Sequence, residues 1–183
     1  MEMKDIKDVA TVLNVGRIII YPTDTIYGIG CLISFPKSVE KIFKIKKRPK
    51  TKSLLIMVRD IEMLKEYAIF SAKEEKIILR NLKKPVSFVI KARKGKIPGI
   101  VNAKGKTVGV RFPNTVFLKK LFKEINYPLI TTSANISGKP FPKRFKDIDK
   151  EILDEVDLAI QGKNLTGKPS KVIDLRTGRV LRE

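Results

Sequence analysis

Three polar loops hold the side chains of this sequence that are best suited to binding an anionic ligand. The first, residues 21–30, reads Tyr-Pro-Thr-Asp-Thr-Ile-Tyr-Gly-Ile-Gly and follows an apolar run. It places two hydroxyls and a carboxylate in an expected turn that ends with two glycines. Hydroxyl groups donate to phosphates and carboxylates, and glycine lets backbone amides approach a ligand. An ordinary polar turn explains the same pattern, which by itself favours neither interpretation.

The second loop, residues 46–52, carries five cations around Pro49 at the expected end of a helix. Lysine as a point charge and arginine as a planar fork can surround a polyphosphate. A solvated basic helix end, favourable to the helix dipole, is the plainer interpretation of this run alone. The third loop, residues 131–138, crowds four hydroxyls and the amide of Asn135. A capping turn needs one or two such groups, so the excess favours a ligand site.

Two further patterns are incomplete. Residues 162–168 copy the spacing of a phosphate-binding loop through Lys168, but Pro169 stands where a magnesium-binding Ser or Thr and a helix should begin. We expect a flexible basic loop there that can touch a ligand. Gly28 and Gly30 begin a dinucleotide fingerprint, which fails at Ile33.

Composition limits the chemistry. The chain has no histidine and one cysteine, which excludes a histidine base, a Ser-His-Asp triad, an internal disulfide and a cysteine-rich zinc site. Its 39 Lys and Arg exceed its 19 Asp and Glu by 20, which indicates an anionic partner such as a nucleotide, nucleic acid or membrane surface. A lysine-rich proteome explains part of such an excess.

Apolar periodicity predicts the elements that must position these loops. Strands are expected over 17–22, 53–58, 86–90, 107–112, 128–133, 157–160 and 171–175, and helices over 5–15, 37–47, 60–67, 71–82, 114–124 and 147–156, the fifth capped by Asn114. Alternating strands and helices predict an α/β sheet covered by helices, with ligands beyond strand ends. No apolar run spans a bilayer and the N-terminus has no apolar signal core, so we expect a cytoplasmic protein without membrane contact.

The chain resembles the YrdC-type threonylcarbamoyl-adenylate synthases over nearly its whole length. The likeness rests on six motifs in order: YPTDTIYGIG, IFKIKKRPKTKSL, PVSFVIKA, TVGVRFP, TTSANISGKP and PSKVIDLRTGRVLR. It implies a twisted open mixed sheet flanked by helices with a basic concave face, a YrdC-like or RibB-like α/β fold in one domain over 1–183. It also implies synthesis of threonylcarbamoyl-AMP and pyrophosphate from L-threonine, bicarbonate and ATP. A downstream transferase would then carry the threonylcarbamoyl group to tRNA, and the family is also credited with binding double-stranded RNA.

The resemblance also implies the roles of individual residues. Catalysis is implied at Lys46 and Arg48, on the ATP phosphates. ATP contacts are implied at Arg48, Lys52, Ser87, Ser133, Asn135 and Arg182. L-Threonine contacts are implied at Thr25, Lys91 and Thr131. Magnesium would arrive with the nucleotide, with Asn135 as a candidate ligand. One departure is Phe141, which stands where the family has a serine after the Ser-Ala-Asn turn.

Two other functions compete with this one. A non-catalytic module that binds double-stranded RNA or tRNA would show an affinity that falls steeply with salt and no need for Thr25 or Thr131. A synthase would show a melting shift with ATP that grows when threonine is added. A carbamoyl-transfer domain of hydrogenase maturation shares the fold, but usually belongs to longer chains with zinc-finger and acylphosphatase segments.

Overall fold

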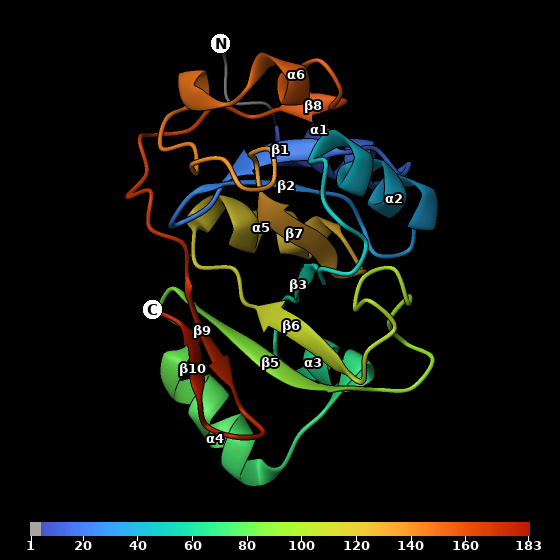
Figure 1. The fold of residues 1–183 in the computed structure, drawn as a ribbon, viewed down its shortest axis with the longest axis vertical. Coiled ribbons are helices and arrows are strands. Elements are labelled where there is room, and N and C mark those ends of the chain that lie inside the picture. Colours follow the sequence, from blue (N-terminus) through green and yellow to red (C-terminus); the bar gives the residue numbers. More distant parts are fainter. Residues whose placement is uncertain (1–4) are drawn as a thin grey trace.

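Short buried strands alternate with amphipathic helices along the chain. The computed structural model describes residues 5–183, in which ten strands make one sheet (Figure 1). They are β1 (Ile19–Pro22), β2 (Tyr27–Gly30), β3 (Leu55–Met57), β4 (Ala68–Ile69), β5 (Val86–Ala92), β6 (Thr107–Arg111), β7 (Leu129–Ser133), β8 (Leu158–Ala159), β9 (Lys171–Asp174) and β10 (Val180–Arg182). Residues 1–4, part of the stretch in which no signal segment is expected, lie outside this range.

The sheet is mixed, as predicted. Its order is β10-β9-β5-β6-β3-β7-β2-β1-β8, with β4 paired to β5. The pairs β1–β8, β3–β6 and β5–β9 are parallel, and the other pairs are antiparallel. Two registers matter for the site, because Ser87 lies opposite Arg111 and Gly28 lies opposite Ser133. Residues far apart in sequence therefore meet on adjacent strands.

Helices flank this sheet, and two of them begin at the predicted caps. They are α1 (Ile6–Asn14), α2 (Pro36–Ile45), α3 (Ile61–Tyr67), α4 (Ala72–Asn81), α5 (Val116–Glu124) and α6 (Lys150–Leu153), with a 3-10 turn η1 (Phe145–Asp147). Asp60 accepts from the amide of Met63, and Ser71 with Glu74 forms the predicted capping box. The buried stripe of α1 is Val9, Ala10 and Leu13, which fixes that helix on the core.

Three local predictions are wrong. The cap of α5 is Thr115, whose hydroxyl accepts from the amide of Leu118, whereas Asn114 turns its amide elsewhere. The helix predicted over 147–156 contracts to α6, because Asp154 and Glu155 would place negative charge at the negative end of a longer helix. The glycines of the first loop do not end a turn, since residues 27–30 form β2.

Close packing explains one of those glycines. A β-carbon built on Gly30 would lie 2.0 Å from the carbonyl oxygen of Ile130 on the neighbouring strand. Only glycine lets β2 and β7 approach this closely. The sequence predicted that Gly30 would let backbone amides approach a ligand. The structure shows instead that Gly30 lets two strands pack closely.

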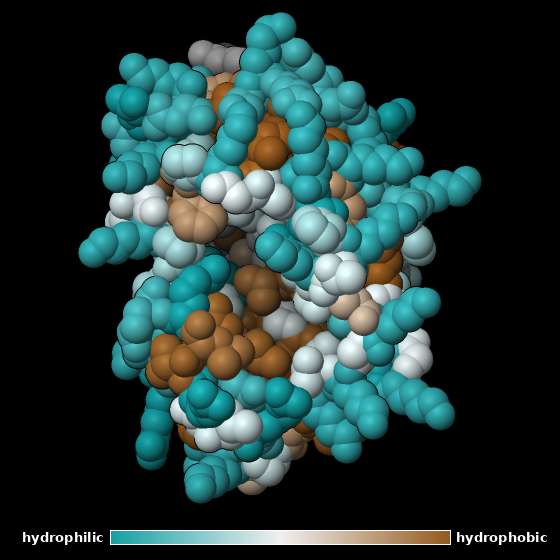
Figure 2. All heavy atoms as spheres, viewed as in Figure 1, coloured by the Kyte–Doolittle hydropathy of each residue, from teal (hydrophilic) through white to brown (hydrophobic). Residues whose placement is uncertain are grey.

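The molecular surface is hollowed near its middle on the face that is seen in Figure 2. Figure 2 shows hydrophilic residues around the hollow and a hydrophobic region along its lower side. The core beneath contains most of the large apolar side chains of the strands, including Phe88, Ile130 and Val110, each at most 1% exposed. Among residues 5–183, no helix is long and apolar enough to cross a membrane.

Candidate functional site

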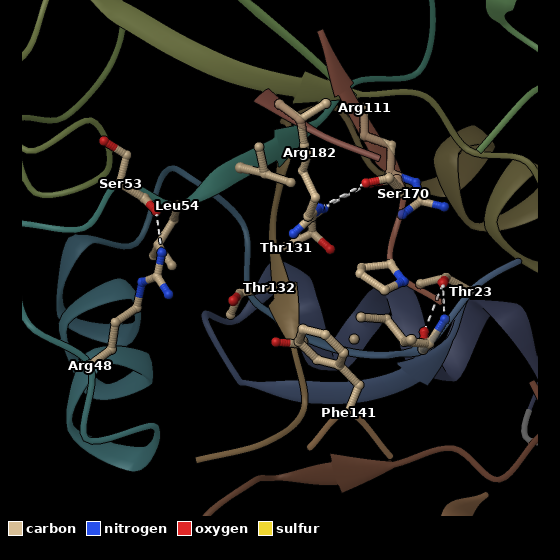
Figure 3. A pocket seen from close by; sticks show the side chains of 16 residues that line it. Thr23, Arg48, Ser53, Leu54, Arg111, Thr131, Thr132, Phe141, Ser170 and Arg182 are labelled. Atoms are coloured by element: carbon tan, nitrogen blue, oxygen red, sulfur yellow. Dashed lines mark hydrogen bonds between the residues drawn. The ribbon is translucent and has the colours of Figure 1, made fainter. Parts of the chain in front are cut away.

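A cavity of about 340 Å³ lies where the three polar loops meet. Its walls come from both ends of the chain and from the middle of the sheet (Figure 3). Hydroxyls and three arginines share these walls with a few apolar side chains. The lining residues are Thr23, Ile26, Gly28, Arg48, Ser53, Leu54, Leu55, Arg111, Thr131, Thr132, Ser133, Phe141, Pro169, Ser170, Val172 and Arg182.

The basic loop contributes Arg48 to this cavity. The chain leaves α2 through Lys47, whose φ of 49° is left-handed, and this turns the next residue toward the sheet. The Arg48 guanidinium donates to the carbonyl of Lys52 at 3.2 Å and to the carbonyl of Ser53 at 2.6 Å. These bonds hold the guanidinium at the cavity wall, and partial burial lowers its pKa.

Lys46 points into the protein, although the same loop carries it. Its side chain is 1% exposed, and its Nζ donates to the carbonyls of Ser133 and Asn135, the latter at 2.7 Å. Burial, and then the charge of Arg48, lowers the pKa of Lys46 to about 7. The two carbonyl acceptors act in the opposite direction, because they stabilise the ammonium form. Lys46 therefore ties the basic loop to the turn after β7.

Thr23 organises the turn between β1 and β2. Its Oγ1 accepts from the amides of Thr25 and Ile26 and donates to the carbonyl of Ile26 at 2.7 Å. The hydroxyls of Thr23 and Thr25 lie 3.1 Å apart. Because the Thr23 hydrogen goes to Ile26, Thr25 is the donor of that pair. The turn is thus fixed from within by its own hydroxyls.

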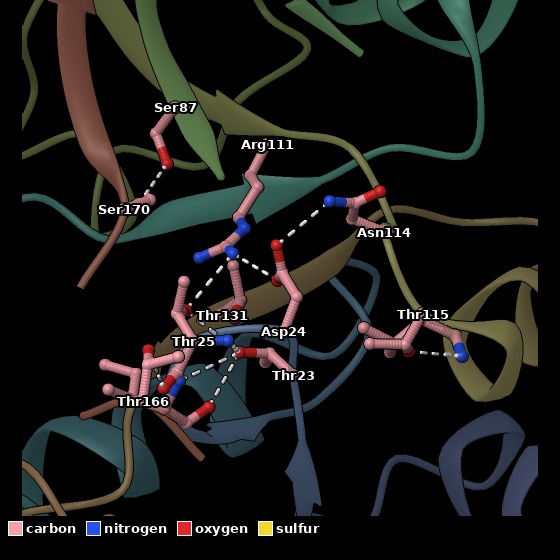
Figure 4. Close-up of polar contacts among 12 residues, drawn as sticks. Thr23, Asp24, Thr25, Ser87, Arg111, Asn114, Thr115, Thr131, Thr166 and Ser170 are labelled. Atoms are coloured by element: carbon pink, nitrogen blue, oxygen red, sulfur yellow. Dashed lines mark hydrogen bonds and ion pairs between the residues drawn. The ribbon is translucent and has the colours of Figure 1, made fainter. Parts of the chain in front are cut away.

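Arg111 joins this turn to β6. Its guanidinium makes an ion pair with Asp24, and the same nitrogen lies 3.2 Å from the hydroxyl of Thr25 (Figure 4). The amide of Asn114 donates to the second oxygen of Asp24 at 3.2 Å and to the carbonyl of Lys83 at 3.0 Å. Since the contacts to Asp24 and Thr25 occupy one guanidinium nitrogen, Arg111 keeps further donors for the cavity that it lines.

Thr131 presents a hydroxyl beside Arg111. The buried phenol of Tyr21 donates to Thr131 Oγ1 at 2.8 Å, and burial raises the pKa of that phenol so that it stays a donor. Because the Thr131 oxygen already accepts from Tyr21, its own hydrogen is available for an acceptor in the cavity. A guanidinium and a hydroxyl donor together suit a carboxylate or a phosphate.

Ser170 holds the third arginine. Its carbonyl accepts from Arg182 Nε at 2.9 Å and from a terminal nitrogen at 2.8 Å, while its hydroxyl lies 2.8 Å from that of Ser87. Partial burial, and then the positive charge of Arg111, lowers the pKa of Arg182. Two guanidinium groups that repel each other across one cavity are both stabilised by an anion placed between them.

The loop that imitates a phosphate-binding motif closes one side of the cavity. Thr166 Oγ1 and the amide of Gly167 both donate to the carbonyl of Thr25, at 3.3 and 3.1 Å. Strand β9, rather than a helix, follows at Lys171, which agrees with rejecting a phosphate-loop assignment. Pro169 and Ser170, which end the loop, line the cavity.

The predicted site residues divide into three groups. Four of them line the cavity: Arg48, Thr131, Ser133 and Arg182. Four are buried behind its wall: Thr25, Lys46, Ser87 and Asn135. Lys52 is exposed and offers its carbonyl to Arg48, and Lys91 lines a different hollow formed by residues 91–106.

Three of these positions correct the expectations. Lys91 lies four residues beyond Ser87 on β5, roughly 13 Å along the strand, so it does not join Thr25 and Thr131. Lys46 is buried among carbonyls and does not face the cavity. Ser87 is buried behind Ser170, and it is Ser170 that lines the cavity.

Sequence reasoning missed Arg111 and Ser170. Arg111 is the last residue of the strand TVGVR, in which Val108 and Val110 are buried in the core. A charged residue at the end of such an apolar strand is the sequence feature that could have identified it. Ser170 precedes β9, and it carried no such signal among many other loop serines and threonines.

The candidate magnesium ligand Asn135 and the acidic side chains are the groups from which a metal site would have to be built. Among residues 5–183, no group of three or more His, Cys, Asp or Glu side chains could hold a metal ion. Asn135 does not suit the predicted role, because its Oδ1 lies 3.4 Å from the Lys46 ammonium and its Nδ2 donates to the carbonyl of Lys139 at 2.6 Å. An ammonium group beside an oxygen repels a divalent cation.

Fold and cavity together define an α/β domain that offers arginines and hydroxyls to an anionic ligand. A family model described as "Telomere recombination", which groups the Sua5, YciO and YrdC proteins, matches residues 11–183. The chain belongs to the Sua5–YciO–YrdC family. A relative from Methanocaldococcus jannaschii, named a putative threonylcarbamoyl-AMP synthase, is 40% identical over 171 residues, covering 93% of this chain and 79% of the relative.

Two solved structures share this fold closely. Sua5 of P. abyssi, crystallised with L-threonine, superposes with a TM-score of 0.88 at 29% identity. The match covers 96% of this chain and 52% of that protein, so the chain spans about half its length. The structure of E. coli YciO gives the same TM-score and identity and covers 100% of this chain and 90% of that one. These likenesses confirm the predicted family and the mixed sheet flanked by helices.

Proposed function

We propose that this protein is an L-threonylcarbamoyladenylate synthase, a nucleotidyltransferase that uses ATP, L-threonine and bicarbonate. The observation that carries the proposal is the convergence of Arg48, Arg111 and Arg182 on one hydroxyl-lined cavity. Relatives named as threonylcarbamoyl-AMP synthases support it, as does a related structure solved with L-threonine. The same comparisons favour an enzyme over the non-catalytic RNA-binding alternative.

The geometry supports a carboxylate site for L-threonine on Arg111 and Thr131. Both residues line the cavity, both have hydrogen-bond donors to spare, and Asp24 and Tyr21 hold them in place. Thr25 takes part by positioning, since its hydroxyl contacts Arg111 from the side of the buried turn. This assignment replaces Lys91, which lies in another hollow.

Arg48 and Arg182 supply the site for the ATP phosphates. The amine of threonine takes up bicarbonate, with loss of water, to give a carbamate. A carbamate oxygen then attacks the α-phosphorus, the bond to the β-phosphate breaks, and pyrophosphate leaves. The protein contributes alignment and charge neutralisation, and the step needs no protein nucleophile. Magnesium would enter with the ATP phosphates rather than on a protein site.

Pyrophosphate release tests this function directly. We expect release from ATP only when L-threonine and bicarbonate are both present. Arg48→Ala should lower the rate by on the order of 10²–10³, the usual cost of removing a group that stabilises developing charge. Lys50→Ala in the same loop is the matched control, because Lys50 pairs with Glu40 outside the cavity. Release that ignores threonine, or full activity in Arg48→Ala, would contradict the proposal.

The partners beyond the small substrates remain predictions from the resemblance. A downstream transferase would accept threonylcarbamoyl-AMP, and tRNA or double-stranded RNA would meet the basic face. The formal charge of +20 is consistent with such a partner.

A further inference from the structure

Phe141 is unusual among the residues of the cavity wall. It is the single aromatic side chain of the sixteen, and the rest are aliphatic, hydroxylated, glycine, proline or arginine. The residue is 37% exposed, although burial of an apolar side chain of this size is favourable. Figure 3 shows the ring turned toward the cavity, with Arg48 and Arg182 also projecting into this view.

Prolines and hydrogen bonds restrict the backbone of the loop that carries Phe141. Pro140 and Pro142 flank the residue, and a following proline restricts Phe141 to an extended backbone. Asn135 Nδ2 donates to the carbonyl of Lys139 at 2.6 Å, and Lys46 in turn fixes Asn135. These contacts limit the backbone conformations open to the loop, which lowers the entropy lost when a ligand binds there.

The cavity has a charged part and an apolar part. Arg48 and Arg182 supply cations for a polyphosphate, but neither distinguishes a nucleotide from inorganic polyphosphate. An aromatic face in the wall of the same cavity supplies what they lack, because every nucleobase has a π-face that stacks on an aromatic ring.

We infer that the Phe141 ring is the stacking platform for the nucleobase of the bound nucleotide. This inference rests on the proposed use of ATP and names the group that recognises its base. Because stacking reads the face of a base and not its hydrogen-bonding edge, Phe141 contributes affinity equally to adenine and guanine nucleotides.

Calorimetric titration with ATP, GTP and inorganic tripolyphosphate tests this assignment. Stacking on an aromatic ring is worth about 1–3 kcal/mol per base, so Phe141→Ala should weaken ATP and GTP binding by roughly fivefold or more. Tripolyphosphate, which has no base, should bind the variant within about twofold of the wild type. Phe141→Trp should retain ATP affinity, and Phe141→Leu should fall between, since it keeps apolar area without a π-face.

Controls separate stacking from loss of structure. Tyr127→Ala removes a half-exposed aromatic side chain outside the cavity and should leave every affinity unchanged. Melting temperatures should show that Phe141→Leu and Phe141→Trp remain folded. Equal weakening of ATP and tripolyphosphate in Phe141→Ala would overturn the inference, as would wild-type binding of ATP no tighter than of tripolyphosphate.

The outcome is distinguishable from failure of the proposed function. If pyrophosphate release does not depend on threonine, the synthase function fails, while a selective loss of ATP and GTP affinity still supports a base platform. If release depends on threonine and Phe141→Ala changes the KM for threonine but not for ATP, the platform assignment is wrong and the synthase function stands.

Discussion

Arg111 and Asp24 form an ion pair across the sheet, between the end of β6 and the turn that follows β1. The two side chains are 8% and 15% exposed, and 87 residues separate them in sequence. Asn114 and Thr25 complete the contacts around the pair. The pair thus fixes a guanidinium at the cavity wall and joins the hairpin to the central strands.

Arg111→Lys should weaken threonine binding selectively. A lysine keeps the charge but loses the fork that serves Asp24 and a ligand carboxylate at once. We expect the KM for threonine in the pyrophosphate assay to rise about tenfold or more, with the KM for ATP within about threefold. Lys91→Ala is the matched control and should leave both values unchanged. A larger effect in Lys91→Ala than in Arg111→Lys would restore the original threonine assignment.

Asp24→Ala should lower the free energy of unfolding, because it leaves the Arg111 guanidinium without its partner. A loss of about 1–3 kcal/mol is expected by urea denaturation. Asp154→Ala, which breaks the exposed pair with Lys150, should cost less than about 1 kcal/mol. Similar losses in the two variants would mean that burial adds nothing to the Arg111 pair.

The pH dependence of stability should carry a signature of Lys46. Its pKa of about 7 in the folded chain lies below the ordinary 10.5. Between these values the unfolded chain binds more protons than the folded one, so the free energy of unfolding rises with pH. We expect a rise on the order of 2–4 kcal/mol from Lys46 between pH 6.5 and 10. Lys46→Met removes the titrating amine and should flatten this part of the urea-denaturation profile; parallel profiles would contradict the assignment.

Substitution of Arg182 should affect ATP binding, whereas substitution of Ser87 should affect stability. Arg182→Ala removes a cation from the wall and should raise the KM for ATP by about tenfold or more. Ser87→Ala removes a buried hydrogen bond to Ser170, so it should cost about 1 kcal/mol of stability and change the KM for ATP less than about threefold. Were Ser87→Ala to raise that KM as strongly as Arg182→Ala, Ser87 would contact the nucleotide directly.

Gly30→Ala should destabilise the protein. The new β-carbon would meet the carbonyl of Ile130 at 2.0 Å, and β2 would have to move away from β7. We expect a loss of at least about 2 kcal/mol by urea denaturation. At Gly99 the nearest atom to such a carbon is the flexible Lys104 side chain at 3.3 Å, so Gly99→Ala should change stability by less than about 1 kcal/mol.

Much of this architecture was readable from the sequence, since buried strands and caps leave strong local patterns. The capping box at Ser71 and the strands SLLIMV and VSFVI fall where the periodicity places them. The 147–156 segment misled because its spacing of isoleucines resembles a helix, while its terminal acids oppose one.

The sequence identified the loops that form the site, but not the directions in which their side chains point. Five cations in seven residues predict an anion site, yet a left-handed backbone at Lys47 sends Arg48 to the wall, while Lys46 enters the interior. Strand register likewise decides that Ser87 faces Arg111 and that Lys91 lies far beyond it. Side-chain direction and register depend on the assembled sheet, which no local pattern encodes.

Several contacts that build the cavity join distant parts of the chain. Lys46 reaches Ser133 across 87 positions, and Ser87 meets Ser170 across 83. Such non-local contacts require the assembled sheet, so the cavity exists only in the folded chain. No single segment carries the site, and transplanting one loop into another scaffold would transfer none of its chemistry. An engineer who wishes to move this activity must move the whole sheet.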